Sequence, residues 1–231
     1  MEKPLYPSPY MRITQGYMNG THAGSYAIDE AGMDTGIDHI YAPFTGVIKK
    51  IYKSGSNEVW LESIDKVLYP DGTVDYMTVL FCHDNDVSDL FVGKVIKKGE
   101  IFYQEGTKGN ATGNHCHIEC GLGKFTGSGW HKNSYGYWCI NNGKKPEECL
   151  WIDESIKIIN SNGYIFKLIK DEIIPEQGND EDEIVISDND NNEEEPVKPE
   201  DEFIKPKLIF TAPKDDLYAI ELEKGQKLYL E

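Results

Sequence analysis

The chain has 231 residues, a formal net charge of −17 at pH 7 and 39% hydrophobic residues. This length allows one domain of ordinary size plus an appendage. No run of about eighteen apolar residues occurs, which excludes a membrane-spanning helix, and residues 1–7 lack the cationic and apolar regions of a secretory signal. Five cysteines, an odd number, argue against a fully oxidised disulfide framework.

Short runs of β-branched and aromatic residues predict a mainly β fold. Such runs favour strands, so we expect strands at residues 47–52, 58–62, 74–81, 95–96 and 101–103. Turn-forming Gly, Asn, Asp and Pro residues separate these runs. No long helical pattern is present, so helices are expected to be few or short. The expected product is a twisted antiparallel sheet whose loops wall a groove.

A pair of histidines, His115 and His117, follows these strands. A strand would place them side by side on one face with Cys116 behind them. Two imidazoles this close favour metal binding, although surface or core histidines produce the same pattern. Upstream, His22 and Asp29 offer the ligand types that complete a zinc site with three protein ligands and one open position, which is the catalytic arrangement.

The cysteines lack the spacing of a zinc knuckle or ribbon. His83 follows an apolar run as a strand-end residue that would point opposite to Cys82. Cys82 and Cys116 alternate with the histidines, so both are expected in the core behind the site. Cys139 and Cys149 could form a disulfide, but buried free thiols are the expected state in a protein made in a reducing cytosol.

A loop rich in Gly and aromatic residues, 127–138, comes directly after the histidine strand. Its Trp130, Tyr135 and Trp138 either hold substrate or pack a small secondary core, and the sequence does not choose between these readings. His131, in the same loop, is expected to be a bystander rather than a ligand.

The negative charge is concentrated in one stretch near the C-terminal end. Residues 171–202 contain fifteen Asp and Glu against one Lys, a net charge of −14 out of −17. We therefore expect three parts: a folded domain at 1–170, a disordered acidic linker at 171–206, and a small β segment at 207–231. The Asp and Asn run at 188–192 in this linker lacks the Gly and distal Glu of a calcium loop, so a solvated tether is expected there. The role of the last segment, wall binding or self-association into an oligomer, stays open.

Taken in order, the motifs before residue 125 resemble those of the LytM/lysostaphin type of zinc endopeptidase (peptidase family M-twenty-three), which cuts peptide bonds in bacterial cell walls. This resemblance implies a LytM-type twisted sheet with a duplicated hybrid motif. It rests on the following series: Thr14-Gln15-Gly16-Tyr17, His22, Asp29, Tyr41-Ala42-Pro43-Phe44-Thr45-Gly46-Val47-Ile48, His83, Val92-Gly93-Lys94-Val95-Ile96-Lys97-Lys98-Gly99-Glu100 and Gly106-Thr107-Lys108-Gly109-Asn110-Ala111-Thr112-Gly113-Asn114-His115-Cys116-His117.

Carried onto this chain, the resemblance implies that His22, Asp29 and His117 bind one zinc ion and that His83 and His115 are catalytic residues outside its coordination. Zinc would act as a Lewis acid and lower the pKa of its bound water toward roughly 7. His115 would take the proton of that water. His83 would either stabilise the oxyanion or give a proton to the leaving amine.

One spacing departs from the family pattern. The family usually separates the first histidine and the aspartate by an even step, whereas the step from His22 to Asp29 is seven. On one straight strand an odd step points the two side chains to opposite faces. Gly24 and Ser25 could turn the backbone and restore convergence. If they do not, three nearby residues are substitute ligands: Asp34, Asp38 and His39.

The implied substrate, the peptide of peptidoglycan, lies outside the cytoplasm, while no secretory signal is visible. A bacteriophage lysin that is synthesised in the host cytoplasm reconciles the two, because it reaches the wall through holes made by a second phage protein (a holin) or rides on the virion tail. Arg12 is the only arginine among many lysines, which is typical of an AT-rich genome. Nucleic acid is not an expected partner of this acidic chain.

Three functions from different classes follow from this sequence. The first is an active zinc endopeptidase. The second is a non-catalytic wall-binding or regulator-activating module of the same fold, and the presence of all five site residues argues against it. The third is a phage tail-associated structural protein with an accessory peptidase. Which peptide bond is cleaved, in which host, and the oligomeric state are not fixed by these patterns.

Overall fold

The computed structural model describes residues 1–170. The expected acidic linker at 171–206 and the expected C-terminal segment at 207–231 lie outside the described residues. Within 1–170 the only helices are two short 3₁₀ turns, η1 (Gly20–His22) and η2 (Pro146–Glu148). No helix in this range is long and apolar enough to cross a membrane. The fold is mainly β, as expected.

The strands are short, and they include all five runs predicted from composition. Residues 74–81 form two strands rather than one, because Tyr76 interrupts the run. The strands of the described region are β1 (Tyr10–Gln15), β2 (Ile28–Glu30), β3 (His39–Tyr41), β4 (Gly46–Tyr52), β5 (Glu58–Ser63), β6 (Val67–Leu68), β7 (Val74–Asp75), β8 (Met77–Cys82), β9 (Val95–Ile96), β10 (Ile101–Gln104), β11 (Cys116–Leu122), β12 (Trp130–Lys132), β13 (Trp138–Ile140), β14 (Gly143–Lys144) and β15 (Lys157–Asn160).

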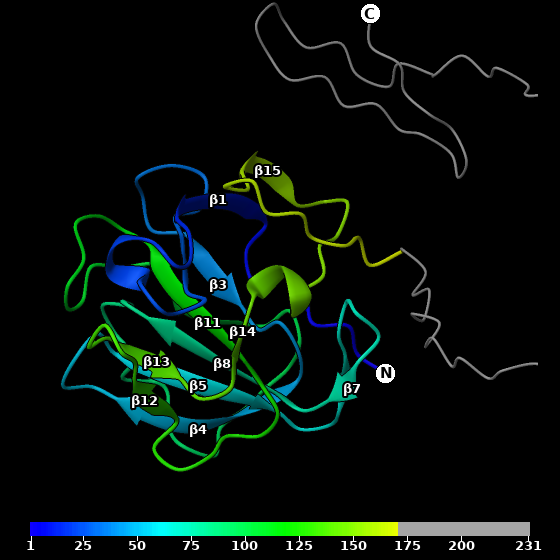
Figure 1. Cartoon of the computed structure of the whole chain (residues 1–231), viewed down its shortest axis with the longest axis horizontal. Helices are drawn as coiled ribbons and strands as arrows, with labels where there is room; N and C mark the ends of the chain where they lie inside the picture. Colours follow the sequence, from blue (N-terminus) through cyan, green and yellow to red (C-terminus); the bar gives the residue numbers. More distant parts are fainter. Residues whose placement is uncertain (171–231) are drawn as a thin grey trace, which may run out of the picture. The chain divides into compact units, whose positions relative to one another are not determined.

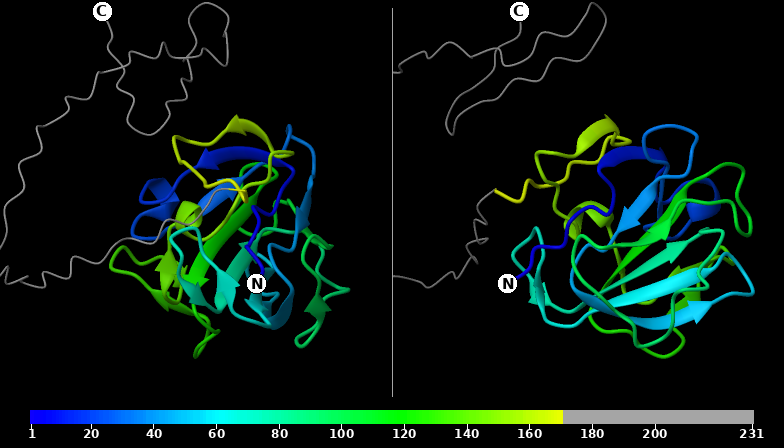
Figure 2. Two further views of the ribbon diagram at one scale, coloured as in Figure 1. Left: turned by 90° about the vertical axis from the view of Figure 1, so that its right-hand side faces the viewer. Right: turned by 180° about the vertical axis from the view of Figure 1, so that it is seen from behind.

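One large sheet organises the domain. Its strand order is β15-β1-β2-β11-β8-β5-β4-β9, with β14 also paired to β11. In Figure 1 the strands β11, β8, β5 and β4 run side by side across the lower half of the domain, and Figure 2 shows the same strands from two further sides. The sheet is antiparallel as expected except at one edge, where β1 pairs with β15 in parallel.

The two faces of this sheet differ in chemistry. On β8 and β11, Phe81 and Ile118 are directly paired and belong to the main hydrophobic core. Successive side chains of a strand point to opposite faces, so Cys82 and His117, also directly paired, lie together on the other face. Five residues of that second face, on β11, β8 and β5, line a groove: His117, Glu119, Cys82, Leu80 and Glu58. The core thus supports the sheet from one side, and the candidate site occupies the other.

Candidate metal centre

His22 reaches the site from η1 rather than from a strand. Its imidazole is buried, with 3% of the residue exposed, and its Nδ1 lies 3.1 Å from the carbonyl oxygen of Gly16. A carbonyl can only accept a hydrogen bond, so Nδ1 carries the proton. This hydrogen bond at Nδ1 fixes the tautomer of the ring, so the lone pair of Nε2 is left for a metal.

Asp29 converges with His22 despite the odd spacing between them. The concern about opposite faces assumed one continuous strand, whereas His22 lies in η1 and Asp29 lies in β2. Between them Gly24 takes a positive φ of 75°, a conformation that glycine adopts without strain. The backbone therefore turns as the sequence allowed. Asp29 is also directly paired with His117 across β2 and β11, which places both side chains on one face.

The proposed substitute ligands lie elsewhere. Asp34 and Asp38 accept hydrogen bonds from nearby backbone N–H groups of their own loop, at 2.6 Å from Gly36 and 2.7 Å from Met33. His39 is exposed on β3. None of these three residues lines the groove.

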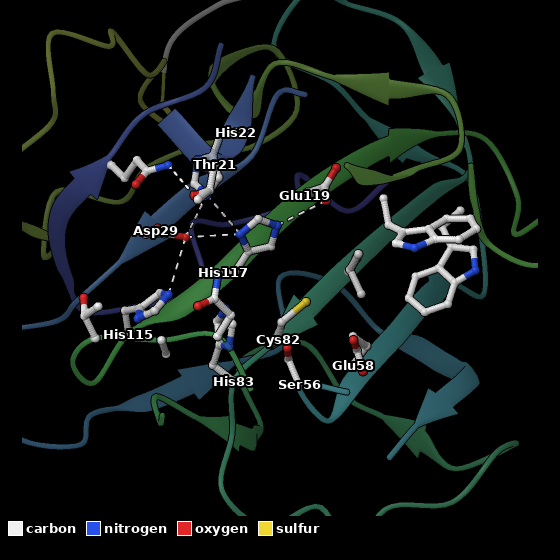
Figure 3. A pocket seen from close by; sticks show the side chains of 17 residues that line it. Thr21, His22, Asp29, Ser56, Glu58, Cys82, His83, His115, His117 and Glu119 are labelled. Carbon is white, nitrogen blue, oxygen red and sulfur yellow. Dashed lines mark hydrogen bonds and ion pairs between the residues drawn. The ribbon is translucent and has the colours of Figure 1, made fainter. Parts of the chain in front are cut away.

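Three donor atoms form a compact triangle (Figure 3). His117 Nδ1 lies 3.1 Å from Asp29 Oδ1 and 3.1 Å from His22 Nε2, and His22 Nε2 lies 3.2 Å from Asp29 Oδ1. Two ligands of one tetrahedral zinc at normal bond lengths are about 3.3 Å apart. Two imidazoles and one carboxylate are also a common ligand set of catalytic zinc. Both the spacing and the chemistry of this triangle therefore fit a zinc ion.

Glu119 supports this triangle from behind His117. Its Oε1 lies 3.1 Å from His117 Nε2, so that the Nε2–H group donates a hydrogen bond to the carboxylate while Nδ1 faces the other two donor atoms. The second oxygen, Oε2, accepts a hydrogen bond from the backbone N–H of Ile140 at 3.1 Å. A carboxylate behind a ligating histidine orients the ring and raises its basicity. Sequence reasoning missed Glu119, although its position two residues after His117 placed it on the same strand face.

Charge in the triangle favours a bound cation. Burial alone would raise the pKa of Asp29, but the imidazoles of His117 and His22, which lie within hydrogen-bonding distance of the carboxylate, hold that pKa well below its usual range. Burial would lower the pKa of His117, but the hydrogen bonds to Asp29 and Glu119 outweigh it and raise the pKa to about 10. The two carboxylates therefore stabilise positive charge at this imidazole. A proton and a metal ion compete for such a position.

His115 and His83 face the triangle from the other side. His115 Nδ1 lies 2.8 Å from the Gly113 carbonyl, and its Nε2 lies 3.7 Å from Asp29 Oδ1. His83 Nδ1 lies 2.7 Å from the Lys108 carbonyl. Both rings are thus held by a backbone acceptor at Nδ1, and both keep a free lone pair at Nε2. Their ring centroids are 4.5 Å apart.

His83 is held neutral by its surroundings. Burial, together with the neighbouring histidines, lowers its pKa to about 4. Its backbone has a φ of 91°, which breaks the alternation of β8. For this reason His83 and Cys82 both line the groove. Cys82 is buried in a small hydrophobic cluster, as expected, but it lies on the groove face rather than behind the site. Cys116, in contrast, is fully buried in the main core, as expected.

The remaining cysteines and aromatic residues resolve two open questions. All five cysteines are free and buried, including Cys139 and Cys149. The aromatic loop packs a small secondary core, because Trp130 contacts Trp60 with ring centroids 5.0 Å apart, and Trp130 and Trp138 also line the groove. His131 is exposed and does not line it.

The groove has a volume of about 390 Å³. All five histidine and aspartate residues predicted for the site, His22, Asp29, His83, His115 and His117, contribute to its wall. The structure therefore brings together every residue that the motifs selected. The groove is also lined by residues to which the sequence analysis assigned no role in the site: Gln15, Thr21, Ser56, Glu58, Leu80, Asn110, Ala111, Thr112 and Glu119.

A curated phage protein is similar to the chain in sequence. Over 176 residues the chain is 31% identical to Morphogenesis protein 1 of Bacillus phage B103. The match covers 70% of this chain and 43% of that protein, so the chain spans less than half the length of this relative. No protein-family model matches the chain.

The fold of this chain is similar to several solved structures of peptidases. A zinc-containing peptidase from Vibrio cholerae is 20% identical, with 52% of this chain and 37% of that chain covered at a TM-score of 0.40. The catalytic domain of the prophage-encoded EnpA from Enterococcus faecalis is 22% identical, with 53% and 88% covered and a TM-score of 0.39. The catalytic domain of lysostaphin from Staphylococcus simulans is 21% identical, with 63% and 89% covered and a TM-score of 0.38. Likeness at this level assigns no activity.

Proposed function

We propose that this protein is a zinc-dependent endopeptidase that hydrolyses peptide bonds in the stem or crossbridge of bacterial peptidoglycan, and that it acts as a bacteriophage lysin. One observation carries the proposal: three donor atoms spaced 3.1–3.2 Å apart face two further imidazoles, each held at Nδ1 by a backbone carbonyl so that Nε2 is left for proton transfer. The first feature suits a zinc ion with an open position. The second supplies groups that accept and donate protons.

His22 Nε2, Asp29 Oδ1 and His117 Nδ1 would hold the metal. When bound there, zinc supplies Lewis acidity toward the scissile carbonyl and lowers the pKa of water to about 7. Glu119 keeps the proton of His117 on Nε2 and so keeps Nδ1 available. The buried carboxylate of Asp29 is ionised, which favours a cation over an empty site.

The two unligated histidines would move the proton of hydrolysis. His115 Nε2 accepts a proton from the attacking water, whose oxygen forms the new bond to the carbonyl carbon. As the carbon–nitrogen bond breaks, the leaving amine must gain a proton. His83 is 4.5 Å from His115, centroid to centroid, and its low pKa makes its protonated form a strong acid. Once its Nε2 has received the proton that His115 took from water, it can deliver that proton to the amine or to the oxyanion.

The phage relative supports the phage part of the proposal. Its printed name, a morphogenesis protein, also favours a second candidate: a peptidase that is part of the virion and acts when the phage enters the cell. Both candidates use the same site on the same substrate, and they differ in when the protein meets the wall. Release through a holin is part of the lysin candidate alone. A non-catalytic wall-binding module is less well supported, because such a module need not keep five converging site residues.

Digestion of purified peptidoglycan tests the proposal. Zinc-loaded protein should release new amino termini from at least one of several peptidoglycan chemotypes, and mass spectrometry of the fragments would identify the bond. Chelation should abolish the release, and added zinc should restore it. His131→Ala is the matched control for substitutions of the site histidines, because His131 is an exposed histidine outside the groove. No release from any chemotype by the zinc-loaded chain would contradict the proposal.

A further inference from the structure

The groove continues away from the metal centre along the sheet. β8 follows β11 in the sheet, and β5 follows β8. His117 is paired with Cys82, and the pairing of Val59 with Phe81 puts Glu58 beside Cys82 on the same face. Figure 3 shows Glu58 on the far side of Cys82 from His117. Two strand spacings separate Glu58 from His117, a distance of roughly 10 Å.

Glu58 is a buried carboxylate without the partners that such a group normally has. Only 9% of the residue is exposed, and its Oε2 is buried with no hydrogen-bond partner. No ion pair joins Glu58 to a lysine, arginine or histidine of residues 1–170. Burying a carboxylate oxygen without compensation is unfavourable. A ligand that donates hydrogen bonds to it would remove that penalty.

Burial lowers the pKa of Lys50, and the nearby charge of Glu58 partly opposes this, but the Lys50 ammonium contacts other groups. Its Nζ donates a hydrogen bond to the Ser128 carbonyl at 2.6 Å. The same Nζ lies 4.1 Å from the Trp130 ring centroid and 4.5 Å from the Trp60 ring centroid. These contacts hold the ammonium of Lys50 against the aromatic rings. The Lys50 ammonium therefore makes no ion pair with Glu58, which lines the groove.

The groove wall near Glu58 also suits a ligand with an aliphatic chain and an ammonium group. Leu80 provides an apolar floor, and Trp130 and Trp138 line the same groove with ring centroids 5.3 Å apart. Indole faces attract cations and pack against methylene groups. An acidic group among such residues distinguishes a charged amine from its neutral amide.

We propose that Glu58 forms a subsite for a substrate ammonium group. Resting on the proposed function, this inference narrows the substrate to wall peptides with a free amine, on a diamino-acid side chain or at a chain terminus. The roughly 10 Å from His117 corresponds to about three residues of extended peptide. The recognised amine therefore lies about three residues from the scissile bond.

Binding of a product-like peptide to the full-length protein tests the subsite without requiring hydrolysis. The probe is L-alanyl-D-isoglutamyl-L-lysyl-D-alanine, compared by titration calorimetry with its Nε-acetyl and Nα-acetyl forms. A hydrogen-bonded ion pair predicts that acetylating the recognised amine weakens binding about tenfold. The Nε-acetyl arm reports a side-chain amine, and the Nα-acetyl arm reports a terminal amine.

Glu58→Gln keeps the side-chain shape and removes the charge, so it should bind all three peptides with nearly equal affinity. Glu100→Gln, which removes an exposed acid outside the groove, should behave like the wild type. Equal binding of all three peptides to the wild type, no binding of any of them, or retained discrimination in Glu58→Gln would each overturn the subsite. None of these results depends on zinc or turnover, so they are separable from a failure of the peptidase proposal.

Discussion

The two faces of the central sheet have different roles: one packs against the hydrophobic core and the other carries the candidate site. Phe81 and Ile118 point into the main core, whereas their chain neighbours Cys82 and His117 point into the groove. The apolar face packs against the main hydrophobic core, and Glu30, the buried carboxylate paired with Cys116 on that face, accepts a hydrogen bond from the core residue Tyr6. The groove face of the same strands collects ionisable groups that hold one another in place. Strand alternation lets one short segment serve both purposes, so neighbouring substitutions should have different consequences.

The largest effect should follow from changing the groove residue His83. Asparagine tolerates positive φ better than most residues, so His83→Asn suits the backbone at this position while removing the imidazole. We expect hydrolysis to fall about 10²- to 10⁴-fold, the usual contribution of a proton-transfer group. Zinc content and the unfolding temperature should change little. Steady-state rates on a cross-linked peptide and zinc analysis measure these quantities, and an active His83→Asn variant would remove His83 from the proposed chemistry.

Phe81→Ala should reduce the stability of the fold while leaving zinc binding by the folded protein unchanged. Phe81 is fully buried and packs edge-on against Phe102, with ring centroids 5.1 Å apart. Truncating such a side chain destabilises a protein by about 3–5 kcal/mol. The fraction that stays folded should still bind one zinc ion. Urea unfolding followed by circular dichroism provides the free energy, with Cys82→Ala as the neighbouring control for which a smaller loss is expected. Equal destabilisation by both substitutions would erase the distinction between the faces.

A smaller effect is expected at Glu119, which contacts His117 but none of the other donor atoms of the triangle. Glu119→Gln keeps an acceptor near His117 Nε2 and removes the negative charge. Loss of a carboxylate behind a ligating histidine typically weakens metal affinity about 10- to 100-fold. Competition with a chelator of known zinc affinity would measure the shift. If affinity is unchanged, the hydrogen bond at 3.1 Å has a structural role only.

Much of the fold and of the candidate site could be predicted because the signals are local. Runs such as Val47 to Tyr52 formed the expected strands, and the His-x-His pattern placed His115 and His117 toward one groove. The parallel pairing of β1 with β15 could not be predicted, because it joins segments about 145 residues apart and depends on tertiary packing.

Other features depend on backbone details that no composition rule specifies. The positive φ of His83 reversed the expected orientation of Cys82. The 3₁₀ turn at His22 made the parity of the spacing to Asp29 irrelevant. From the sequence, Glu58 was predicted only to be part of a strand. Its lack of a hydrogen-bond partner depends on how the strands pack, so it could not be predicted.

The central claim is that neighbouring histidines on one groove wall have different roles, and zinc analysis of two variants tests it most directly. His117→Ala removes one corner of the donor triangle, so it should lose both zinc and activity. His115→Ala keeps all three donors, so it should retain close to one zinc per chain and lose most turnover, because the proton acceptor is gone. Atomic emission on both purified variants, with circular dichroism as the folding control, decides the matter. Equal zinc loss in both variants, or full zinc in both, would contradict the account.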